Sequence, residues 1–570
     1  MDFDSVEACP LKEGDTCDHT NKRRNNFYRR NGLHFNKSKI RHFVWATCGV
    51  VLPCVAVLLI VLLINTLLCT DKHSVDKDTI FNNTKNRYGA DKDYDINATR
   101  SLEILKKMIK IDAITFGDKR DAYEKYRQRF TDFANLLDEE FPHVNNSKNV
   151  EKTVINGSLL YKINGSDPNL EPWMILGHID VVPAENISQW TKHPFGGNSS
   201  NENREDDEEE YLYGRGTLDV KSIIAAIFTC LEMKLEKDKT WQPDRPIYIF
   251  MGHDEETGGH GGAKVAAEML KNQNVTLKFI VDEGAFVMKN YFKGIDRPVA
   301  LIGVAEKGYV SLDVEATADA GHSSMPGQDS SIEKLAKVIT RIKQNPFPDH
   351  FETGDVIRET FERIAPYTSF FYRIIFSNIW LFKQGILYFL KGAPETQAAL
   401  RTTTAFTIIN GGFKENVMPS KATVTVNHRL HSHEDIEDVL RRYKDLLKDF
   451  TGVTVKLREG WKNNATPISP YGSKDLAYQA VKASINKVFK NSIVAPYVTL
   501  GGTDSKHLLE LTSKIYRFIP HVLNKTTNDA KRIHGIDERF KIKNYEKCIK
   551  FYQALMDYAD QIDEIEKMNR

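Results

Sequence analysis

The stretch WMILGHID, residues 173–180, decides the fold class. Four large apolar residues are followed closely by a histidine and an aspartate. An uninterrupted apolar run of this length is typical of a strand that is buried on both faces of a parallel sheet. The polar pair then stands at the carboxyl end of the strand, where ligands gather in open α/β sheets.

Two later stretches repeat this arrangement of a short apolar run followed by acidic or imidazole side chains. They are IYIFMGHDEETGG, residues 247–259, and LKFIVDEG, residues 277–284. Residues 217–234 and 261–271 carry apolar side chains at helical spacing. Strands that alternate with helices predict an α/β domain with a mixed, mostly parallel sheet.

A second module follows from about residue 309. Its order of elements is strand, helix, strand, strand, helix, strand, which is the split ferredoxin-like α+β pattern. We expect these elements over residues 309–317, 330–343, 403–409, 422–430, 434–449 and 453–457. A long insertion interrupts the module, and after it the chain returns to the first domain.

The insertion holds an apolar segment, residues 370–390, that resembles a membrane span. It contains Arg373, Asn378 and Lys383, which are costly in lipid. A span here would also carry the rest of the chain to the other side of the membrane, away from His178. We therefore expect an amphipathic or buried helical hairpin.

Residues 43–69 contain no charged side chain and are long enough to cross roughly 30 Å of hydrocarbon. A cleaved signal peptide is disfavoured because the apolar run is too long and the polar residues 1–42 precede it. Residues 23–41 carry basic but no acidic side chains, which keeps the N-terminus in the cytoplasm. The expected topology is a single-pass type II membrane protein with a lumenal catalytic domain.

Ten N-x-S/T sequons lie beyond this apolar run, which agrees with a glycosylated lumenal domain. They begin at Asn82, Asn97, Asn145, Asn156, Asn164, Asn186, Asn198, Asn274, Asn464 and Asn524. The formal net charge of +1 over 570 residues offers no basic excess for phosphates, so no nucleic-acid partner is expected.

The strand ends carry ligands for metal ions. Imidazoles and carboxylates without thiolates suit zinc, cobalt or manganese. His178, Glu255, Glu256 and Asp282 follow the three strands, and Asp219 opens the helix between the first two. More than four such ligands suggest two metals that share a carboxylate, about 3.5–4 Å apart.

The motifs together resemble the M20 metallopeptidase family, most closely its fungal carboxypeptidase S (Gly-Xaa carboxypeptidase) branch. The resemblance runs from about residue 100 to the C-terminus, and the combination of motifs is highly specific. It rests on GHIDVVP (177–183), YGRGTLDVKS (213–222), GHDEETGG (252–259), VDEG (281–284), AGHSSMP (320–326), GGTDSKH (501–507) and RIHGIDE (532–538).

The resemblance implies two Zn²⁺ ions per subunit held by five ligands. His178 and Asp282 would hold one ion, Glu256 and His534 would hold the other, and Asp219 would bridge both.

The resemblance also gives two acidic residues catalytic roles. Glu255 would be the general base that takes a proton from the attacking water and passes it to the leaving amine. Asp180 would accept the ring N–H of His178 and so fix its tautomer.

Substrate contacts follow from the same resemblance. His322 would stabilise the oxyanion from the lid, and Asn416 and Arg429 would be further lid contacts. Gly501, Gly502 and Thr503 would offer backbone N–H groups to the substrate carboxylate.

One residue departs from the branch. Lys506 stands where arginine is usual, and lysine cannot make a planar bidentate clasp.

The apolar run, the charged, Asn-rich composition after it and the order of elements give the domain plan, and the resemblance names its catalytic and lid domains. The plan has a cytoplasmic tail (1–42), a transmembrane anchor (43–69), a stalk (70–100), a catalytic domain in two parts (101–308 and 459–570) and an inserted lid domain (309–458) with its insertion (345–400).

Three functions are compatible with these motifs. The leading one is a zinc carboxypeptidase that removes the last residue of short peptides of the Gly-Xaa type. The alternatives are an N-acyl-amino-acid hydrolase or synthase and a non-catalytic receptor with a peptidase fold. The resemblance also implies delivery to the fungal vacuole, and a homodimer is possible because lids in the family dimerise.

Overall fold

The computed structural model describes residues 37–69, 81, 96–116, 120–204, 207–460 and 462–568. It divides into two compact units, residues 1–64 and residues 65–570. Most of the expected tail and stalk, and the sequon at Asn82, lie outside the described residues.

The described part of the first unit belongs to α1 (Lys37–Leu67), which runs on into the second. Its segment Val50–Leu67 has a mean hydropathy of 2.8. Among the helices in the described ranges, α1 is the one long and apolar enough to cross a membrane by length and composition.

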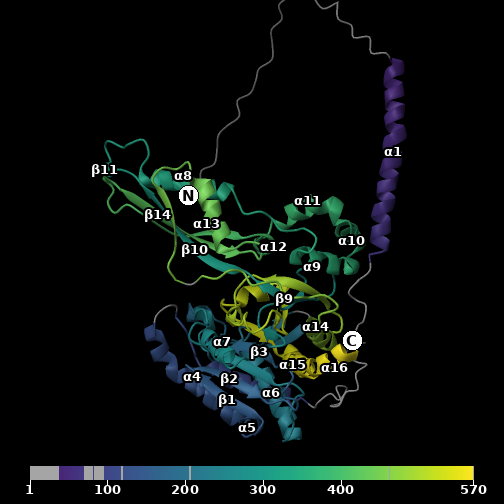
Figure 1. Ribbon diagram of the computed structural model, residues 1–570, viewed down its shortest axis with the longest axis vertical. Helices are drawn as coiled ribbons and strands as arrows, with labels where there is room; N and C mark the ends of the chain where they lie inside the picture. The colour runs from purple at the N-terminus through teal and green to yellow at the C-terminus, as the bar shows by residue number, and fades with distance from the viewer. Residues whose placement is uncertain are drawn as a thin grey trace, which may run out of the picture. The chain divides into compact units, whose positions relative to one another are not determined.

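A mixed sheet of ten strands forms the centre of the second unit (Figure 1). Its middle strands β6, β3, β7 and β17 pair in parallel, whereas β2 and β9 join antiparallel at either side. The neighbours are, in order, β1 (Val150–Ile155), β2 (Ser158–Ile163), β6 (Ile247–Gly252), β3 (Trp173–His178), β7 (Ile280–Asp282), β17 (Ile515–Arg517), β9 (Val299–Glu306), β8 (Val287–Lys289) and β18 (Val522–Asn524), and β16 (Ile493–Thr499) also pairs with β9.

The strands β3, β6 and β7 are buried at every position, as their apolar runs predict. Apolar side chains cover both sheet faces. One face packs against α3 (Ala98–Lys110), α6 (Lys221–Lys237), α14 (Leu476–Val488) and α15 (Tyr545–Asp560), and the other packs against α7 (Ala263–Asn272). The expected strand over residues 277–281 begins later, because Leu277 and Lys278 donate their N–H groups to loops.

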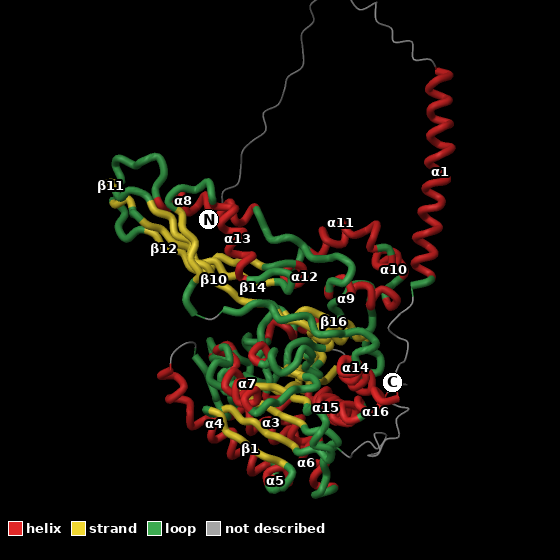
Figure 2. Tube along the Cα trace, in the orientation of Figure 1, coloured by secondary structure: helices red, strands yellow, loops and turns green. Residues whose placement is uncertain are grey.

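A second, antiparallel sheet has the order β12-β14-β10-β15, with α8 and α13 packed on one face (Figure 2). Residues of β10 alternate between buried and half-buried positions, so every second side chain faces the helices. Capping boxes at Ser330 and Asp435 begin the two helices. The elements are β10 (Gly308–Thr317), α8 (Ser331–Gln344), β12 (Thr403–Gly411), β14 (Lys421–Leu430), α13 (Ile436–Leu447) and β15 (Val453–Leu457).

The insertion is mostly helical from Val356 onward. Asn378 separates two short helices, so residues 370–390 form no continuous span. Ile379, Ile386 and Leu390 pack into an apolar cluster with β9 and β16. The helices are α9 (Val356–Ile364), α10 (Phe370–Ser377), α11 (Ile379–Leu390) and α12 (Pro394–Leu400).

Smaller elements complete the described chain. Two smaller sheets accompany the two large ones. One has two strands and the other has three. They consist of β11 (Gly321–His322) with β13 (Val417–Met418), and of β4 (Asn198–Arg204), β5 (Asp207–Tyr213) and β19 (Arg539–Lys541); the remaining helices include α4 (Arg120–Glu140), α5 (Pro142–Asn145) and α16 (Ile562–Met568).

Candidate metal centre and substrate cavity

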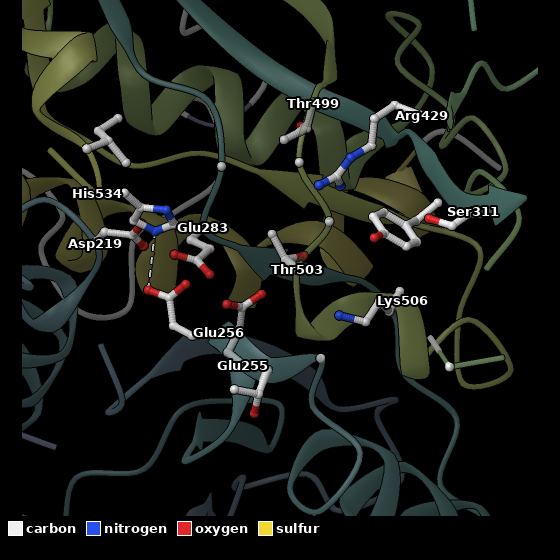
Figure 3. Close-up of a pocket in the computed structure, with 18 of the residues that line it drawn as sticks. Asp219, Glu255, Glu256, Glu283, Ser311, Arg429, Thr499, Thr503, Lys506 and His534 are labelled. Atoms are coloured by element: carbon white, nitrogen blue, oxygen red, sulfur yellow. Dashed lines mark ion pairs between the residues drawn. The ribbon is translucent and has the colours of Figure 1, made fainter. Parts of the chain in front are cut away.

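Five side chains with nitrogen or oxygen donors meet at the carboxyl ends of the central strands, and Figure 3 shows four of them. His178 ends β3, Glu256 follows β6 and Glu283 follows β7. Asp219 stands just before α6, and His534 lies in the loop that leads to β19. Residues that are more than 350 positions apart in the chain therefore share one site.

Asp219 is the shared member of two groups of donors. One of its oxygens, Oδ1, lies 3.1 Å from Nε2 of His178, and Oδ2 lies 2.8 Å from Nε2 of His534. Glu283 Oε1 is 3.4 Å from the same nitrogen of His178, and Glu256 Oε1 is 3.3 Å from that of His534. A carboxylate between two histidines is the arrangement that a two-metal site requires.

His178 is held by its other ring nitrogen. Nδ1 lies 2.8 Å from the backbone oxygen of Asp180 and 3.4 Å from Oδ1 of its carboxylate. The backbone oxygen is therefore the nearer acceptor for the ring N–H. This contact turns Nε2 toward Asp219 and Glu283, as in a metal-ligating histidine.

The Asp180 carboxylate also fixes the loop after β6. It accepts the backbone N–H groups of Glu255 and Glu256, each at 3.2 Å, and the Thr115 hydroxyl at 2.7 Å. Both glutamates line the cavity (Figure 3). Desolvation, followed by the charges of Glu283 and Glu256, raises the pKa of Glu255 well above its ordinary value.

Two glycines of the same loop leave room for a buried carboxylate. A Cβ on Gly252 would lie 2.2 Å from Asp504 Oδ2, and one on Gly259 would lie 2.1 Å from Oδ1. Gly259 also has a φ of 72°, which disfavours any other residue. The glycines of GHDEETGG therefore let the β6 loop pack closely on the loop of Asp504.

Asp282 belongs to neither of the donor groups found among the described residues. Its Oδ1 accepts the Glu283 N–H at 2.8 Å, and its Oδ2 accepts the Thr503 hydroxyl at 2.6 Å and the Ser505 N–H at 3.2 Å. Glu283 occupies the position that the resemblance gave to Asp282. Adjacent side chains at a strand end point to opposite sides, so only one of the pair reaches the site.

The donors fit divalent metal ions. Two imidazoles and three carboxylates are the ligand types that zinc accepts. Burial, and then the charges of Asp219 and Asp282, raise the pKa of Glu283 well above its ordinary value. Burial alone would raise the pKa of Asp219. The contacts with His178 and His534 outweigh burial, so this pKa lies below its ordinary value. A cation bound here would offset the repulsion among these carboxylates.

Two further residues, to which the motifs assigned no role, hold the backbone of the centre in place. Arg215 and Glu538 form a buried ion pair that contacts the backbone of Asp219 and His534. Both lie inside quoted motifs, YGRGTLD and RIHGIDE, but only the three-dimensional structure reveals their pairing.

A cavity of about 680 Å³ opens over the donors. Its other wall is the face of the second sheet that is turned away from α8 and α13, with Tyr309 and Ser311 on β10 and Thr425 and Arg429 on β14. Apolar side chains from both walls also contribute, namely Phe286, Ile408, Ile519 and Ile533.

The same cavity contains cationic and backbone groups suited to an anion. Arg429 points inward from β14 and stacks 4.8 Å from the centre of the Tyr309 ring (Figure 3). Lys506 and the turn Gly501–Thr503 line the opposite wall. No side chain crowds the Cβ positions of Gly501 and Gly502 among the described residues.

His322 and Asn416 do not line this cavity. His322 lies in β11, at one end of the second sheet (Figure 1), and is exposed. Its Nδ1 is 2.8 Å from Ser324 Oγ. Asn416 is also exposed and accepts the Ser323 N–H at 3.2 Å through its backbone oxygen.

The chain matches the model of peptidase family M20/M25/M40 over residues 174–558, more than half of its length. This match includes all five donors and the second sheet.

Several curated proteins are similar over most of their length. N-fatty-acyl-amino acid synthase/hydrolase PM20D1 of Xenopus tropicalis is 39% identical over 460 residues, which cover 80% of this chain and 86% of that protein. Probable carboxypeptidase S-like 2 of Dictyostelium discoideum is 34% identical, with 79% and 83% covered. Carboxypeptidase S of Saccharomyces cerevisiae is 26% identical, with 79% and 82% covered.

Two solved structures share the fold. The M20 family metallo-carboxypeptidase Sso-CP2 of Sulfolobus solfataricus has a TM-score of 0.56 at 19% identity, with 81% of this chain and 99% of that chain covered. Human carnosine dipeptidase 1 has a TM-score of 0.52 at 16% identity, with 82% and 97% covered.

Proposed function

The chain belongs to peptidase family M20/M25/M40, and from this premise we propose that it hydrolyses an amide bond next to a free carboxylate, with two zinc ions and Glu255 as the general base. The single observation that carries the proposal is the Asp219 carboxylate, which lines the cavity and whose two oxygens contact two different histidines. A hydrolase also accounts for Glu255, which a non-catalytic receptor would not need.

The proposed ligands follow the two donor groups. His178 and Glu283 would hold one zinc ion, Glu256 and His534 the other, and Asp219 both. Glu283 replaces Asp282 in this assignment, because both oxygens of Asp282 already accept hydrogen bonds, Oδ1 from the Glu283 N–H and Oδ2 from Thr503 and Ser505. When bound, the two ions supply the Lewis acidity that activates water and polarises a carbonyl at neutral pH.

Glu255 is the side chain placed to move the proton. Its neighbour Glu256 faces His534, whereas Glu255 lines the cavity without entering either donor group. It accepts a proton from the attacking water and donates it to the leaving nitrogen. The hydrogen bonds from the backbone N–H groups of Glu255 and Glu256 to the Asp180 carboxylate fix the backbone of both glutamates. The acid–base role of Glu255 and the ligand role of Glu256 therefore stay separate.

The free carboxylate of the substrate would meet Arg429, Lys506 and the Gly501–Thr503 turn. These groups line the same cavity as Asp219. A guanidinium binds a carboxylate through paired N–H groups, whereas the lysine adds a point charge. The requirement for a free carboxylate follows from these two cationic side chains.

Two substrate classes share this chemistry. The Gly-Xaa type of peptide is the first, and the name of carboxypeptidase S fits it. An N-acyl-amino acid is the second, and its support is the higher identity to the N-fatty-acyl-amino acid synthase/hydrolases. The apolar side chains of Phe286, Ile408 and Ile519 in the cavity also suit an acyl chain.

One experiment separates the two classes. The purified full chain is assayed against a blocked Gly-Leu dipeptide and against a long-chain N-acyl-leucine, which share the leaving amino acid. A ratio of kcat/KM that favours the dipeptide supports the carboxypeptidase, and the reverse ratio supports the acyl-amino-acid hydrolase. Failure to hydrolyse either, with zinc bound, would refute the proposed function.

The second sheet with α8 and α13 would act as a lid. Its inner face forms one wall of the cavity, so its movement would admit or enclose substrate. His322 reaches a substrate only if this lid moves or a second copy supplies the residue, because it does not line the cavity of its own chain. The proposed homodimer would meet the second condition.

The proposed location is a lumen reached through the N-terminal helix as a type II anchor. Support comes from the apolar segment Val50–Leu67 and from the sequons, because none of the nine in described residues has a buried asparagine. The vacuole is the proposed compartment, by resemblance to carboxypeptidase S. Removal of residues 1–70 should release an active, soluble protein, and persistent membrane association would contradict the single anchor.

A further inference from the structure

Three histidines form a separate cluster away from the cavity. His350 lies in the segment between α8 and α9, whereas His431 and His433 lie in the turn between β14 and α13. Each offers one ring nitrogen, and these nitrogens lie within 4.8 Å of one another. None of the three lines the cavity, and none belongs to a motif used above.

The three ring centres form a compact triangle rather than a column. The centres are 4.4 Å (His350–His431), 4.7 Å (His350–His433) and 5.1 Å (His431–His433) apart, with planes within 14° of parallel. In a column of three rings, the outer two would be about twice as far apart as neighbours. Three nearly equal separations instead describe a triangle of ring centres, and one ring nitrogen of each residue lies within 4.8 Å of the other two.

Two of the rings have a carboxylate on the nitrogen called Nε2. His350 Nε2 is 3.0 Å from Glu434 Oε1, and His433 Nε2 is 3.4 Å from Asp355 Oδ1. These contacts place the ring protons on Nε2 and leave the Nδ1 lone pairs available. Carboxylate–histidine pairs of this kind orient metal-ligating histidines and raise their basicity.

The third ring presents its lone pair to the same centre. Nδ1 of His431 is 3.2 Å from Nδ1 of His433, and the His433 backbone N–H approaches it at 3.4 Å. The His431 side chain is buried. In a tetrahedral zinc site with bonds of about 2.0–2.1 Å, ligand nitrogens are about 3.3 Å apart, close to the His431–His433 separation.

We propose that His350, His431 and His433 bind a divalent transition-metal ion, zinc first, at a structural site distinct from the catalytic centre. Imidazole ligands suit zinc, copper and nickel, whereas magnesium and calcium prefer oxygen. The ion joins the start of the insertion to the end of β14, two segments about 80 positions apart in sequence, and so fixes the insertion on the second sheet. A water molecule or a nearby carboxylate takes the remaining position, since only three histidines converge.

The test uses the full chain as the double variant His178→Ala/His534→Ala, which removes one histidine ligand from each proposed catalytic metal site. After chelation, zinc alone is titrated against a competing dye. We expect one tight equivalent in this background, and its loss or an affinity at least 100-fold weaker when His433→Ala is added. Ser432→Ala, in the same turn, should retain the equivalent as the matched control.

A second variant keeps the test decisive if a histidine substitution impairs folding. Asp355→Asn leaves all three rings in place and removes one supporting carboxylate, so zinc affinity should fall by about 10–100-fold while the fold is retained. Zinc should also raise the thermal midpoint of the background protein, and it should raise that of Asp355→Asn less. An unchanged zinc equivalent in both His433→Ala and Asp355→Asn, or no tight equivalent in the background, would overturn the assignment.

Discussion

Arg215 and Glu538 form a buried ion pair, with Arg215 Nη1 2.6 Å from Glu538 Oε2. The other oxygen of Glu538 accepts the N–H groups of Leu218 and Asp219, at 2.8 and 3.2 Å. The other amino group of Arg215 donates to the backbone oxygen of His534 at 3.0 Å. One ion pair therefore positions the shared carboxylate and one of the two histidines that face it.

Glu538→Gln should impair the centre although Glu538 touches no substrate. Removal of one partner leaves the Arg215 charge unpaired and buried, which costs about 3–5 kcal/mol of the free energy of unfolding. We expect lower zinc content at the His534 side and a fall in kcat larger than any rise in KM. Zinc analysis, chemical denaturation and steady-state kinetics measure these effects. A loss of stability with normal zinc content and normal kcat would show that the pair is structural only.

Glu283 and Asp282 should separate by their effect on metal content. Glu283→Gln removes a proposed ligand, so we expect the loss of about one zinc ion per chain and most of the activity. Asp282→Asn removes an acceptor of the Thr503 hydroxyl and should raise KM while both ions remain. Metal analysis of the two variants decides between them. The opposite pattern would restore Asp282 as the ligand that the resemblance implies.

Arg429 should govern recognition of the substrate carboxylate. A hydrogen bond to a charged group contributes about 1.5–3 kcal/mol, so Arg429→Ala should weaken kcat/KM by about 10–100-fold. Arg429→Lys should recover only part of this loss, because lysine makes no bidentate contact. The matched substrate is the same compound with its carboxylate converted to an amide. Equal losses with the acid and the amide would place Arg429 elsewhere in the mechanism.

His322 should act either after lid movement or in a second copy. His322→Ala should lower kcat by about 10²–10³-fold if it stabilises the oxyanion. A mixture of inactive His322→Ala and Glu255→Gln chains distinguishes the two routes. Recovery of activity on mixing, with a dimer in solution, indicates a residue supplied across copies. No recovery in a proven mixed dimer indicates lid closure within one chain.

The polar residues at the strand ends could be predicted from the sequence because a local pattern encodes them. A short apolar run that ends in His178 or in the β6 loop fixes both the strand and the edge where its polar residue lies. The second sheet was predictable for the same reason, since the alternation along β10 is visible in the sequence. Its strands and helices fall within a few residues of the expected ranges.

The rest depends on contacts that no local pattern encodes. The choice between Asp282 and Glu283 turns on where a three-residue strand ends, because a shift of one residue reverses the side chain's direction. Arg215 and Glu538 pair across 323 positions, and the position of His322 depends on how the second sheet sits over the cavity. The cluster of His350, His431 and His433 forms only when the insertion returns to β14.

The most direct test of the account compares turnover and metal content in Glu255→Gln. The substitution keeps the size of the side chain and both donor groups but removes the base. We predict two zinc ions per chain, an unchanged substrate affinity and a fall in kcat of about 10²–10⁴-fold. Full turnover by a Glu255→Gln protein that still holds both zinc ions would contradict the central claim.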